Sequence, residues 1–432
     1  MAERRFEPAG PLGGQLRPPP DKSISHRAAI VAAMSEGQST IENYLDSADT
    51  RSTLDAIGSL GAEVEEIDCD TEGLLLRIRG PGLHGLAGAE IDVGNAGTLL
   101  RILPGWLAGQ EGGVWVLDGD ESIRRRPVDR IAEPLRRMGA QIECRDDRLP
   151  PLRVAGARLH GIDYRLPVAS AQVKSCVLLA GMLAHSETSV IEPMPTRDHT
   201  ERMLEAAGAE VNVTGPEISV RRPFALDPIR IAVPGDFSSA AFALVGALIV
   251  QGSEVAVESV GLNPTRTGLL SILERMGAQL EWGSEEPIQR QEPAGVIRVR
   301  AGPLQPTDVF GEDVPLAIDE LPLIALAACF AKGETVIRDA EELRHKESDR
   351  IAAVADALNA IGGEVEPTPD GLIISGGGGL RGGAIDARGD HRIAMMGAVA
   401  GLASREGVTV SGMDAAAVSY PGFERDLARL VS

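Results

Sequence analysis

The sequence predicts an α/β protein made of six copies of one helix–strand unit, and two recurring patterns lead to this prediction. The first pattern is the string Gly-Ala-Glu-Val or a close variant, which occurs five times, each time after an amphipathic helical segment. The second is a helix rich in Ala, Gly and Leu, followed by a polar turn and a short β-branched strand, which occurs six times. Internal repeats of this kind define the whole architecture, and helices that alternate with short strands are typical of α/β folds.

Each Gly-Ala string predicts the end of an amphipathic helix and the start of a strand. The strings begin at Leu60, Met138, Ala207, Met276 and Ile361. Before the second of them, Ile131, Leu135 and Met138 recur at i, i+4 and i+7, which places them on one helix face. The glycine suits the residue after a helix, and the alternating residues behind it suit a strand.

The six small-residue helices are apolar on almost every side, so they are expected in the core, with the amphipathic helices covering them. Their segments start at Ser25, Asn95, Ser170, Asp236, Asp319 and Asp390. Successive starts lie between 66 residues (Ser170 to Asp236) and 83 residues (Asp236 to Asp319) apart. Three such units make a domain of ordinary size, and the Pro-containing stretch 221–236 divides the third unit from the fourth. The repeats therefore predict two pseudo-threefold domains with a cleft between them.

Composition and charge exclude several classes of function. The chain has 432 residues and a formal net charge of −21, which argues against nucleic acid or an anionic membrane as partner. The longest apolar stretch, Ala240 to Val250, has 11 residues and is too short to cross a bilayer, and the N-terminus lacks the apolar segment of a signal peptide. The four cysteines (Cys69, Cys144, Cys176 and Cys329) show no zinc spacing and are expected to be reduced and mostly buried. We expect a cytoplasmic protein.

Lysine is unusually scarce. Of 42 basic residues only four are lysines, which leaves 38 arginines. The four are Lys22, Lys174, Lys332 and Lys346. Random survival of a few lysines is one explanation, and a need for a compact ammonium group at certain sites is the other. Lys332 lies in a turn and is expected to be merely solvated.

Polar residues gather at the starts of four of the six small-residue helices. They are DKSISHR with Lys22, Ser23 and Arg27, GNAGT with Gly97, SAQVKS with Ser170, Gln172 and Lys174, and DHR with Arg392. Any one of these could be an ordinary N-cap. Because helix N-termini attract anions, the coincidence predicts an electropositive anion site within an acidic protein.

A further charged run, EELRHKESDR, precedes the amphipathic helix of the fifth unit. We expect Lys346, Glu347 and Arg350 to span one helical turn, with Lys346 and Arg350 on the same face. An ordinary solvated helix is an equally good explanation of this run taken alone.

Taken together, the motifs resemble those of the enolpyruvyl transferases, and most closely the branch of that family that acts on shikimate 3-phosphate. The matching segments, in the order of the family, are DKSISHR, GNAGTLLR, RRRPVDR, SAQVKS, TRDHTERM, DELP, HKESDR and DHRIAM. The resemblance implies a two-domain inside-out α/β barrel of six βαβαββ repeats, three per domain, with the active site in the cleft between the domains. It places residues 1–20 and 235–432 in one domain and residues 21–234 in the other.

The resemblance also implies the chemistry: transfer of the enolpyruvyl group of phosphoenolpyruvate to the 5-hydroxyl of shikimate 3-phosphate, with no metal and no cofactor. The residues matched to shikimate 3-phosphate are Lys22, Ser23, Arg27, Ser170, Ala171, Gln172, Arg197, Asp319 and Lys346. Those matched to phosphoenolpyruvate are Lys22, Gly97, Arg126, Gln172, Arg350 and Arg392. Asp319 is the candidate base, and Glu347 the candidate proton donor, aided by Lys22. As partners we expect these two small molecules only, and the protein is expected to be a monomer.

Some positions depart from the family or bear on alternatives. Val418 stands where many members carry a lysine, and Arg126 is chosen from three consecutive arginines because it precedes Pro127. Gly97 is retained where some members tolerant of the inhibitor glyphosate carry alanine. One alternative is the branch that uses UDP-N-acetylglucosamine, but the loop DGDESIRRRP lacks that branch's cysteine and Ser23 replaces its asparagine. The other is an inactive binding protein on the same repeats, which predicts erosion of charged motifs that are in fact complete.

Overall fold

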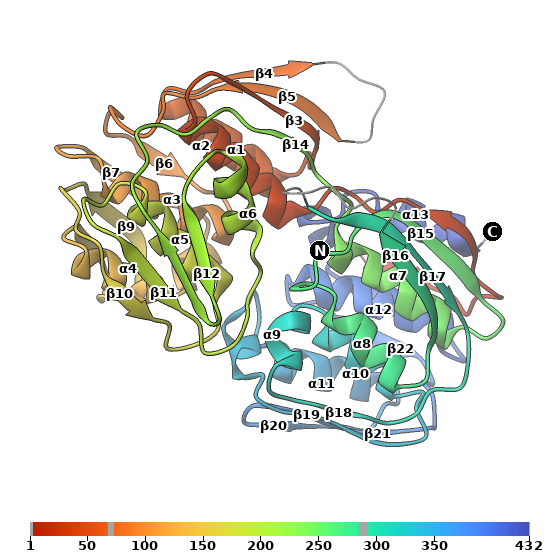
Figure 1. The fold of residues 1–432 in the computed structure, drawn as a ribbon. Coiled ribbons are helices and arrows are strands. Elements are labelled where there is room, and N and C mark those ends of the chain that lie inside the picture. The colour runs from red at the N-terminus through yellow and green to blue at the C-terminus, as the bar shows by residue number, and fades with distance from the viewer. Residues whose placement is uncertain (1–2, 68–72, 285–291, 432) are drawn as a thin grey trace. The chain divides into compact units, whose positions relative to one another are not determined.

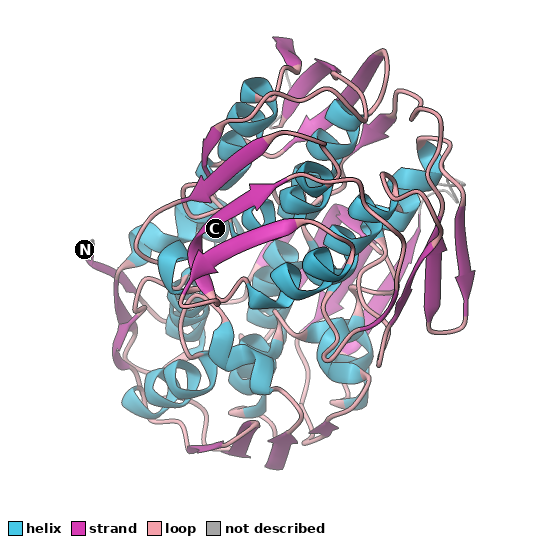
Figure 2. Ribbon diagram, turned by 90° about the vertical axis from the view of Figure 1, so that its left-hand side faces the viewer, coloured by secondary structure: helices cyan, strands magenta, loops and turns pink. Residues whose placement is uncertain are grey.

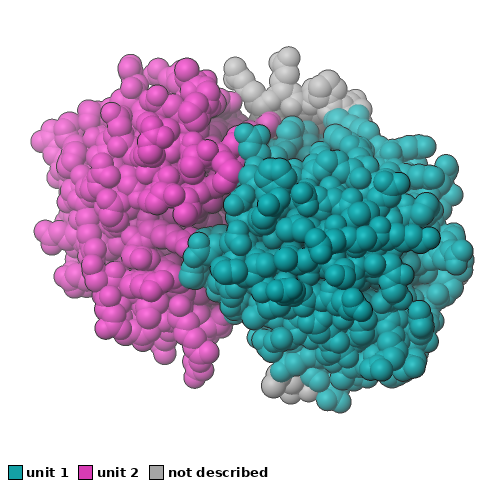
Figure 3. Space-filling view, turned by 90° about the horizontal axis from the view of Figure 1, so that it is seen from below, with its two compact units in different colours: residues 1–19, 234–287, 293–432 teal, residues 20–233, 288–292 magenta. Residues whose placement is uncertain are grey.

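The structure is a computed structural model of the chain, and it describes residues 3–67, 73–284 and 292–431. The chain forms two compact units, each with its own hydrophobic core. Unit 1 comprises residues 1–19, 234–287 and 293–432, and unit 2 comprises residues 20–233 and 288–292. Figure 3 shows unit 1 in teal and unit 2 in magenta.

Unit 2 contains three four-stranded sheets among its described residues. Their strands are β3 (Gln38–Tyr44), β4 (Glu63–Ile67), β5 (Leu74–Arg79), β6 (Glu90–Asp92), β7 (Val114–Asp118), β8 (Gln141–Arg145), β9 (Leu149–Ala155), β10 (Asp163–Arg165), β11 (Thr188–Ile191), β12 (Val211–Thr214), β13 (Glu217–Val220) and β14 (Arg230–Ala232). The strand orders are β14–β3–β5–β4, β6–β7–β9–β8 and β10–β11–β13–β12. In each sheet the first pair is parallel and the other two pairs are antiparallel, so the three sheets repeat one design.

Unit 1 repeats this design, and the N-terminal segment completes it. Its strands are β1 (Glu3–Phe6), β2 (Gly13–Leu16), β15 (Glu254–Gly261), β16 (Gln279–Ser284), β17 (Ala294–Arg300), β18 (Asp308–Val309), β19 (Gly333–Ile337), β20 (Val365–Thr368), β21 (Gly371–Gly376), β22 (Gly383–Asp386) and β23 (Val408–Ser411). Two sheets have the orders β2–β15–β17–β16 and β18–β19–β21–β20, and the third is β22–β23–β1. Strand β2 is the parallel edge of its sheet and β1 pairs antiparallel to β23. The first residues of the chain therefore belong to unit 1.

The predicted small-residue helices are confirmed, and so is the α/β class. They are α1 (Lys22–Met34), α3 (Gly97–Ala108), α5 (Ala171–Gly181), α7 (Phe237–Ile249), α10 (Leu321–Ala328) and α12 (His391–Ala403), all buried along most of their length. Small residues let them approach closely: a Cβ added at Gly105 of α3 would lie 2.1 Å from the carbonyl oxygen of Cys176 in α5. In Figures 1 and 2 the strands lie outside the helices that they flank.

The remaining helices come between the strands of each repeat or near the C-terminus. The amphipathic helices are α2 (Ala48–Ser59), α4 (Asp129–Arg137), α6 (His199–Ala206), α8 (Gly268–Arg275) and α11 (Arg350–Ala360). The others are α9 (Asp313–Ala317), α13 (Phe423–Val431) and the 3₁₀ helices η1 (Ile123–Arg125), η2 (Glu341–His345) and η3 (Met413–Val418). Among the described helices none is long and apolar enough for a membrane crossing. The thiols of Cys144, Cys176 and Cys329 are free, the last two buried, while Cys69 lies outside the described residues.

The predicted helical turn from Lys346 to Arg350 is wrong. Helix η2 ends at His345, and Lys346 has an extended backbone with φ −84° and ψ −158°. The carboxylate of Asp349 accepts a hydrogen bond from the backbone N–H of Ala352 (3.2 Å), and this N-cap starts α11 at Arg350. Lys346 and Arg350 therefore do not share a helix face, and any common site must come from tertiary packing.

Candidate functional site

Residues at the start of α1 form the first polar group of unit 2. Asp21 caps the helix by accepting a hydrogen bond from the N–H of Ile24 (2.9 Å). The next residue, Lys22, places its ammonium 3.1 Å from the carboxylate of Asp49 and is 20% exposed. Lys22 is therefore a partly exposed cation at a helix N-terminus, where an anion gains from both the charge and the free N–H groups.

Arg27 is the buried cation of the same helix. Its Nε donates to Thr200 Oγ1 (3.1 Å) and its Nη2 to Ser175 Oγ (3.2 Å), while Nη1 donates to the carbonyl oxygen of Ser23 (3.0 Å). Burial, and next the charge of Arg197, lower the pKa of Arg27 to about 10. Arg27 therefore remains charged at neutral pH, and the electrostatic effect of Arg197 shows that the two guanidinium groups lie close enough to repel each other.

A second polar group surrounds the N-terminus of α3. Arg126 is 7% exposed, and its Nη2 donates to Asn95 Oδ1 (2.7 Å) and Ser122 Oγ (3.0 Å). A Cβ added at Gly97 would lie 2.9 Å from Arg126 Nη1, so the absence of a side chain there lets the guanidinium reach the helix end. By contrast, Arg124 and Arg125 are exposed and pair with Asp118 and Glu121.

The N-terminus of α5 adjoins this group through Gln172. Its side-chain amide donates to Thr98 Oγ1 (3.2 Å) and accepts a hydrogen bond from Arg101 Nη1 (3.1 Å). Ser170 caps α5 by accepting from the N–H of Val173 (3.4 Å), and Ala171 is the first helical residue. Packing of α3 against α5 thus brings Gly97, Arg126 and Gln172 together. Arg101, which follows the GNAGT segment by one helical turn, joins them, although neither substrate was assigned to it.

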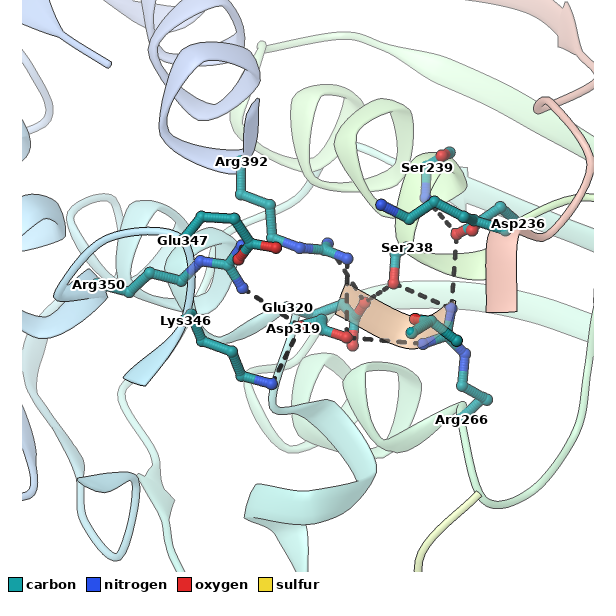
Figure 4. Close-up of polar contacts among 12 residues, drawn as sticks. Asp236, Ser238, Ser239, Arg266, Asp319, Glu320, Lys346, Glu347, Arg350 and Arg392 are labelled. Atoms are coloured by element: carbon teal, nitrogen blue, oxygen red, sulfur yellow. Dashed lines mark hydrogen bonds and ion pairs between the residues drawn. The ribbon is translucent and has the colours of Figure 1, made fainter. Parts of the chain in front are cut away.

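In unit 1 the polar residues converge on Asp319, which lies just before α10 (Figure 4). Four cations approach its carboxylate: Arg350 Nη1 at 3.3 Å, Arg392 Nη2 at 3.7 Å, Lys346 Nζ at 3.8 Å and Arg266 Nη1 at 3.9 Å. The side chain of Asp319 is 13% exposed. These cations surround the carboxylate, and they offer positive charge to an anion that binds beside it.

Arg350 is the most buried of these cations, with 1% of its side chain exposed. Besides Asp319 it pairs with Asp390 (2.8 Å) and with Glu347 (2.6 Å). Burial is the largest effect on the pKa of Asp390 and raises it, but the charge and hydrogen bond of Arg350 together with the charge of His391 outweigh it, and the net pKa lies below the ordinary value. Glu347 is less buried, with 23% of its side chain exposed, so it can exchange protons with solvent.

Arg266 and Glu320 belong to this cluster but were not predicted from the sequence. Arg266 is 4% exposed, and its Nη2 donates to Ser238 Oγ (3.1 Å) and lies 3.5 Å from Asp236. The hydroxyl of Ser238 donates in turn to Glu320, the residue next to Asp319. One feature could have identified Arg266: it stands just before the amphipathic helix of its repeat, as Arg197 does before α6.

The fold has a solved counterpart of low sequence identity. Its structure resembles that of the enolpyruvyl transferase NikO from Streptomyces tendae, with a TM-score of 0.78 over 99% of this chain and 96% of that one. At 19% sequence identity this similarity concerns the fold alone.

Closer similarity identifies the family. The family model for EPSP synthase (3-phosphoshikimate 1-carboxyvinyltransferase) matches residues 6–427. A solved EPSP synthase from Acinetobacter baumannii has a TM-score of 0.86 and 42% identity, covering 100% of this chain and 98% of that one. Relatives named 3-phosphoshikimate 1-carboxyvinyltransferase are 48% identical in a Synechococcus species and 50% identical in Thermus thermophilus, each over 99% of this chain and 98% of the relative. The chain belongs to the EPSP synthase family, as its motifs predicted.

Proposed function

We propose that the protein transfers the enolpyruvyl group of phosphoenolpyruvate to the 5-hydroxyl of shikimate 3-phosphate and releases phosphate, a step of chorismate and aromatic amino-acid biosynthesis. The observation that carries the proposal is the carboxylate of Asp319 among four cations. The four cations suit the phosphate and carboxylate groups of two anionic substrates, and the carboxylate among them can accept the proton of a hydroxyl bound beside it. Relatives with this activity in their names, similar along nearly the whole chain, support the same assignment.

Shikimate 3-phosphate is assigned mainly to unit 2. Its proposed contacts are Lys22, Ser23, Arg27, Ser170, Ala171, Gln172 and Arg197 from unit 2, and Asp319 and Lys346 from unit 1. The helix N-termini of α1 and α5 and the two arginines suit the phosphate and carboxylate groups of this substrate.

Phosphoenolpyruvate is assigned to Lys22, Gly97, Arg126, Gln172, Arg350 and Arg392. Arg126 and Arg350 are both buried, and buried guanidinium groups bind carboxylates and phosphates strongly and with defined geometry. Val418, at the end of η3, supplies no cation, so the arginines must neutralise this substrate without a lysine there.

The proposed reaction is an addition followed by an elimination. Asp319 accepts the proton of the 5-hydroxyl as its oxygen attacks C2 of phosphoenolpyruvate, and the methylene carbon C3 receives a proton from Glu347, aided by Lys22. Loss of a proton from C3, back to the carboxylate of Glu347, then expels phosphate and re-forms the C2–C3 double bond, now as the enol ether of the product. The guanidinium of Arg350 lies 2.6 Å from the carboxylate of Glu347, and an anion that binds at Arg350 competes with Glu347 for its positive charge.

The same proposal concerns the setting of the enzyme. Residues 1–20 with 235–432 and residues 21–234 act as its two domains, and the protein works as a cytoplasmic monomer on small molecules, without nucleic acid or membrane partners. The two compact units and the acidic composition support this part of the proposal.

Phosphate release from phosphoenolpyruvate tests the function directly. We expect release with shikimate 3-phosphate as acceptor and none with UDP-N-acetylglucosamine, and Asp319→Asn should abolish it. Release that depends on the sugar nucleotide would establish the other branch of the family. Absence of release with either acceptor would favour an inactive binding protein.

A further inference from the structure

Lys174 is one of the four lysines of the chain, and the proposed function gives it no role. It lies on α5, two residues after Gln172, and only 1% of its side chain is exposed. Its ammonium lies 2.6 Å from Glu201 Oε1, 3.2 Å from the carboxylate of Glu192 and 3.3 Å from the carbonyl oxygen of Thr196. A buried ammonium is costly unless all its protons are used, and these three acceptors match its three N–H donors.

The three acceptors come from three successive segments of the chain. Glu192 directly follows β11, Thr196 lies in the loop before α6, and Glu201 is in the first turn of α6. The hydroxyl of Thr196 also donates to Glu192, so both the backbone and the side chain of Thr196 are hydrogen bonded. The next residue after Thr196 is Arg197. The ammonium thus fixes the backbone from which Arg197 extends.

Helices α5 and α6 also contact Arg27. Ser175, next to Lys174, and Thr200, next to Glu201, are hydrogen bonded to each other at 2.7 Å, and both accept hydrogen bonds from Arg27. Any shift of α6 against α5 would therefore move the anchors of Arg27 and the backbone of Arg197 together. The ion pair between Lys174 and Glu201 is a buried ionic link between these two helices.

The charges of Lys174 and its two carboxylate partners also influence Arg27. Lys174 carries one positive charge and faces two carboxylates, and Glu201 Oε2 has no hydrogen-bond partner among the described residues. Burial raises the pKa of Glu201, although Lys174 opposes this shift. Glu201 in turn raises the pKa of Arg27, whereas burial and Arg197 lower it. The negative charge behind Arg27 therefore offsets part of the repulsion between the two arginines.

We infer that Lys174, together with Glu192 and Glu201, is a positioning group for shikimate 3-phosphate: it fixes the loop that carries Arg197 and keeps Arg27 and Arg197 close together before the substrate binds. This inference rests on the proposed function, which assigns both arginines to that substrate. It also explains why lysine is retained here, because a planar guanidinium cannot direct its donors to three acceptors arranged around a single nitrogen.

Steady-state kinetics of purified Lys174→Met test the inference against the wild type. We expect the KM for shikimate 3-phosphate to rise about tenfold or more, because small displacements of positioning groups have effects of this size, while the KM for phosphoenolpyruvate changes by less than about threefold. The matched control is Lys332→Met, which removes an exposed lysine of unit 1 and should leave both constants unchanged. Equal changes in both KM values of Lys174→Met, or none, would overturn the inference.

A double-mutant cycle with Arg197→Ala separates positioning from general damage to the fold. If Lys174 acts through Arg197, adding Lys174→Met to Arg197→Ala should change the KM for shikimate 3-phosphate by less than about twofold, whereas independent effects would multiply. Should Lys174→Met fail to fold, Glu192→Gln replaces it, since this change keeps an acceptor for Lys174 and removes only the excess negative charge. We expect Glu192→Gln to raise the same KM selectively, and an unchanged KM would contradict the inference.

Turnover by the wild type distinguishes failure of the inference about Lys174 from failure of the proposed function. A wild-type protein that turns over both substrates, combined with unaltered variants, would refute the role of Lys174 alone. A wild-type protein without turnover would refute the proposed function, and the role of Lys174 with it.

Discussion

Replacing Arg350 by methionine should destabilise unit 1 as well as impair the reaction. Methionine keeps the apolar stem but removes the cation shared by Asp319, Asp390 and Glu347, and Asp390 is fully buried. Removal of one member of a buried ion pair costs about 3–5 kcal/mol, because the other member stays behind unpaired. In a unit of this size each 1 kcal/mol shifts Tm by about 2–4 °C, so a fall of about 6–20 °C is expected.

The pH dependence of this effect identifies its origin. In the wild type the pKa of Asp390 is lowered, so its contribution to stability is present above about pH 4 and is lost as pH falls through the folded-state pKa. Without Arg350 the burial of Asp390 raises its pKa instead, and protonation then relieves the cost of the buried charge. The Tm difference between Arg350→Met and the wild type should therefore be smaller at pH 5 than at pH 8.

Differential scanning calorimetry at the two pH values provides the measurement. Arg300→Met is the matched control: Arg300 pairs with Glu254 at 3.1 Å in the same unit, but its side chain is 56% exposed. Exposed pairs contribute little, so this variant should unfold at the wild-type temperature. A fall in Tm of less than about 3 °C for Arg350→Met, or one independent of pH, would refute the reasoning.

Three further predictions concern unit 2. Lys22→Met should lower turnover about a hundredfold or more. It should also lower Tm without unfolding the protein, because the carboxylate of Asp49, which is 6% exposed, loses the ammonium 3.1 Å away. Assays of phosphate release and calorimetry measure both, and near wild-type turnover would contradict its role. Gly97→Ala should fold, since its Cβ meets only the flexible ends of Arg126 (2.9 Å) and Arg101 (3.3 Å). It should also raise the KM for phosphoenolpyruvate several-fold and weaken inhibition by glyphosate. An unaltered KM and inhibition constant would contradict the assignment of phosphoenolpyruvate to Gly97. Burial lowers the pKa of His26 to about 3, so the ring stays neutral in the folded state and wild-type stability should fall as pH drops below about 6.5. His26→Gln should remove about 1.4 kcal/mol of that loss per pH unit in urea unfolding between pH 6 and 5, and an unchanged slope would show that His26 is not the titrating group.

The sequence by itself determined the repeating elements of this protein, because they depend on local patterns. The small-residue helices and the Gly-Ala strands follow from periodicity and from the glycine that ends each amphipathic helix. The polar residues at helix starts, such as Lys22 and Ser170, were likewise predictable, since N-termini need caps and attract anions. The resemblance of ordered motifs then supplied the family, which the comparisons confirm.

Only the tertiary structure decided how these residues combine. The sequence suggested that Lys346 and Arg350 share a helix face, yet Asp349 caps α11 between them and they meet only at Asp319. Arg266 reaches Asp319 from a loop in another repeat, and Lys174 turns inward to two carboxylates that follow it by 18 and 27 residues in the chain. Pairings of this kind depend on which surfaces the repeats bury against one another. The scarcity of lysine pointed to Lys174, but only the packing of α5 against α6 shows what its ammonium holds.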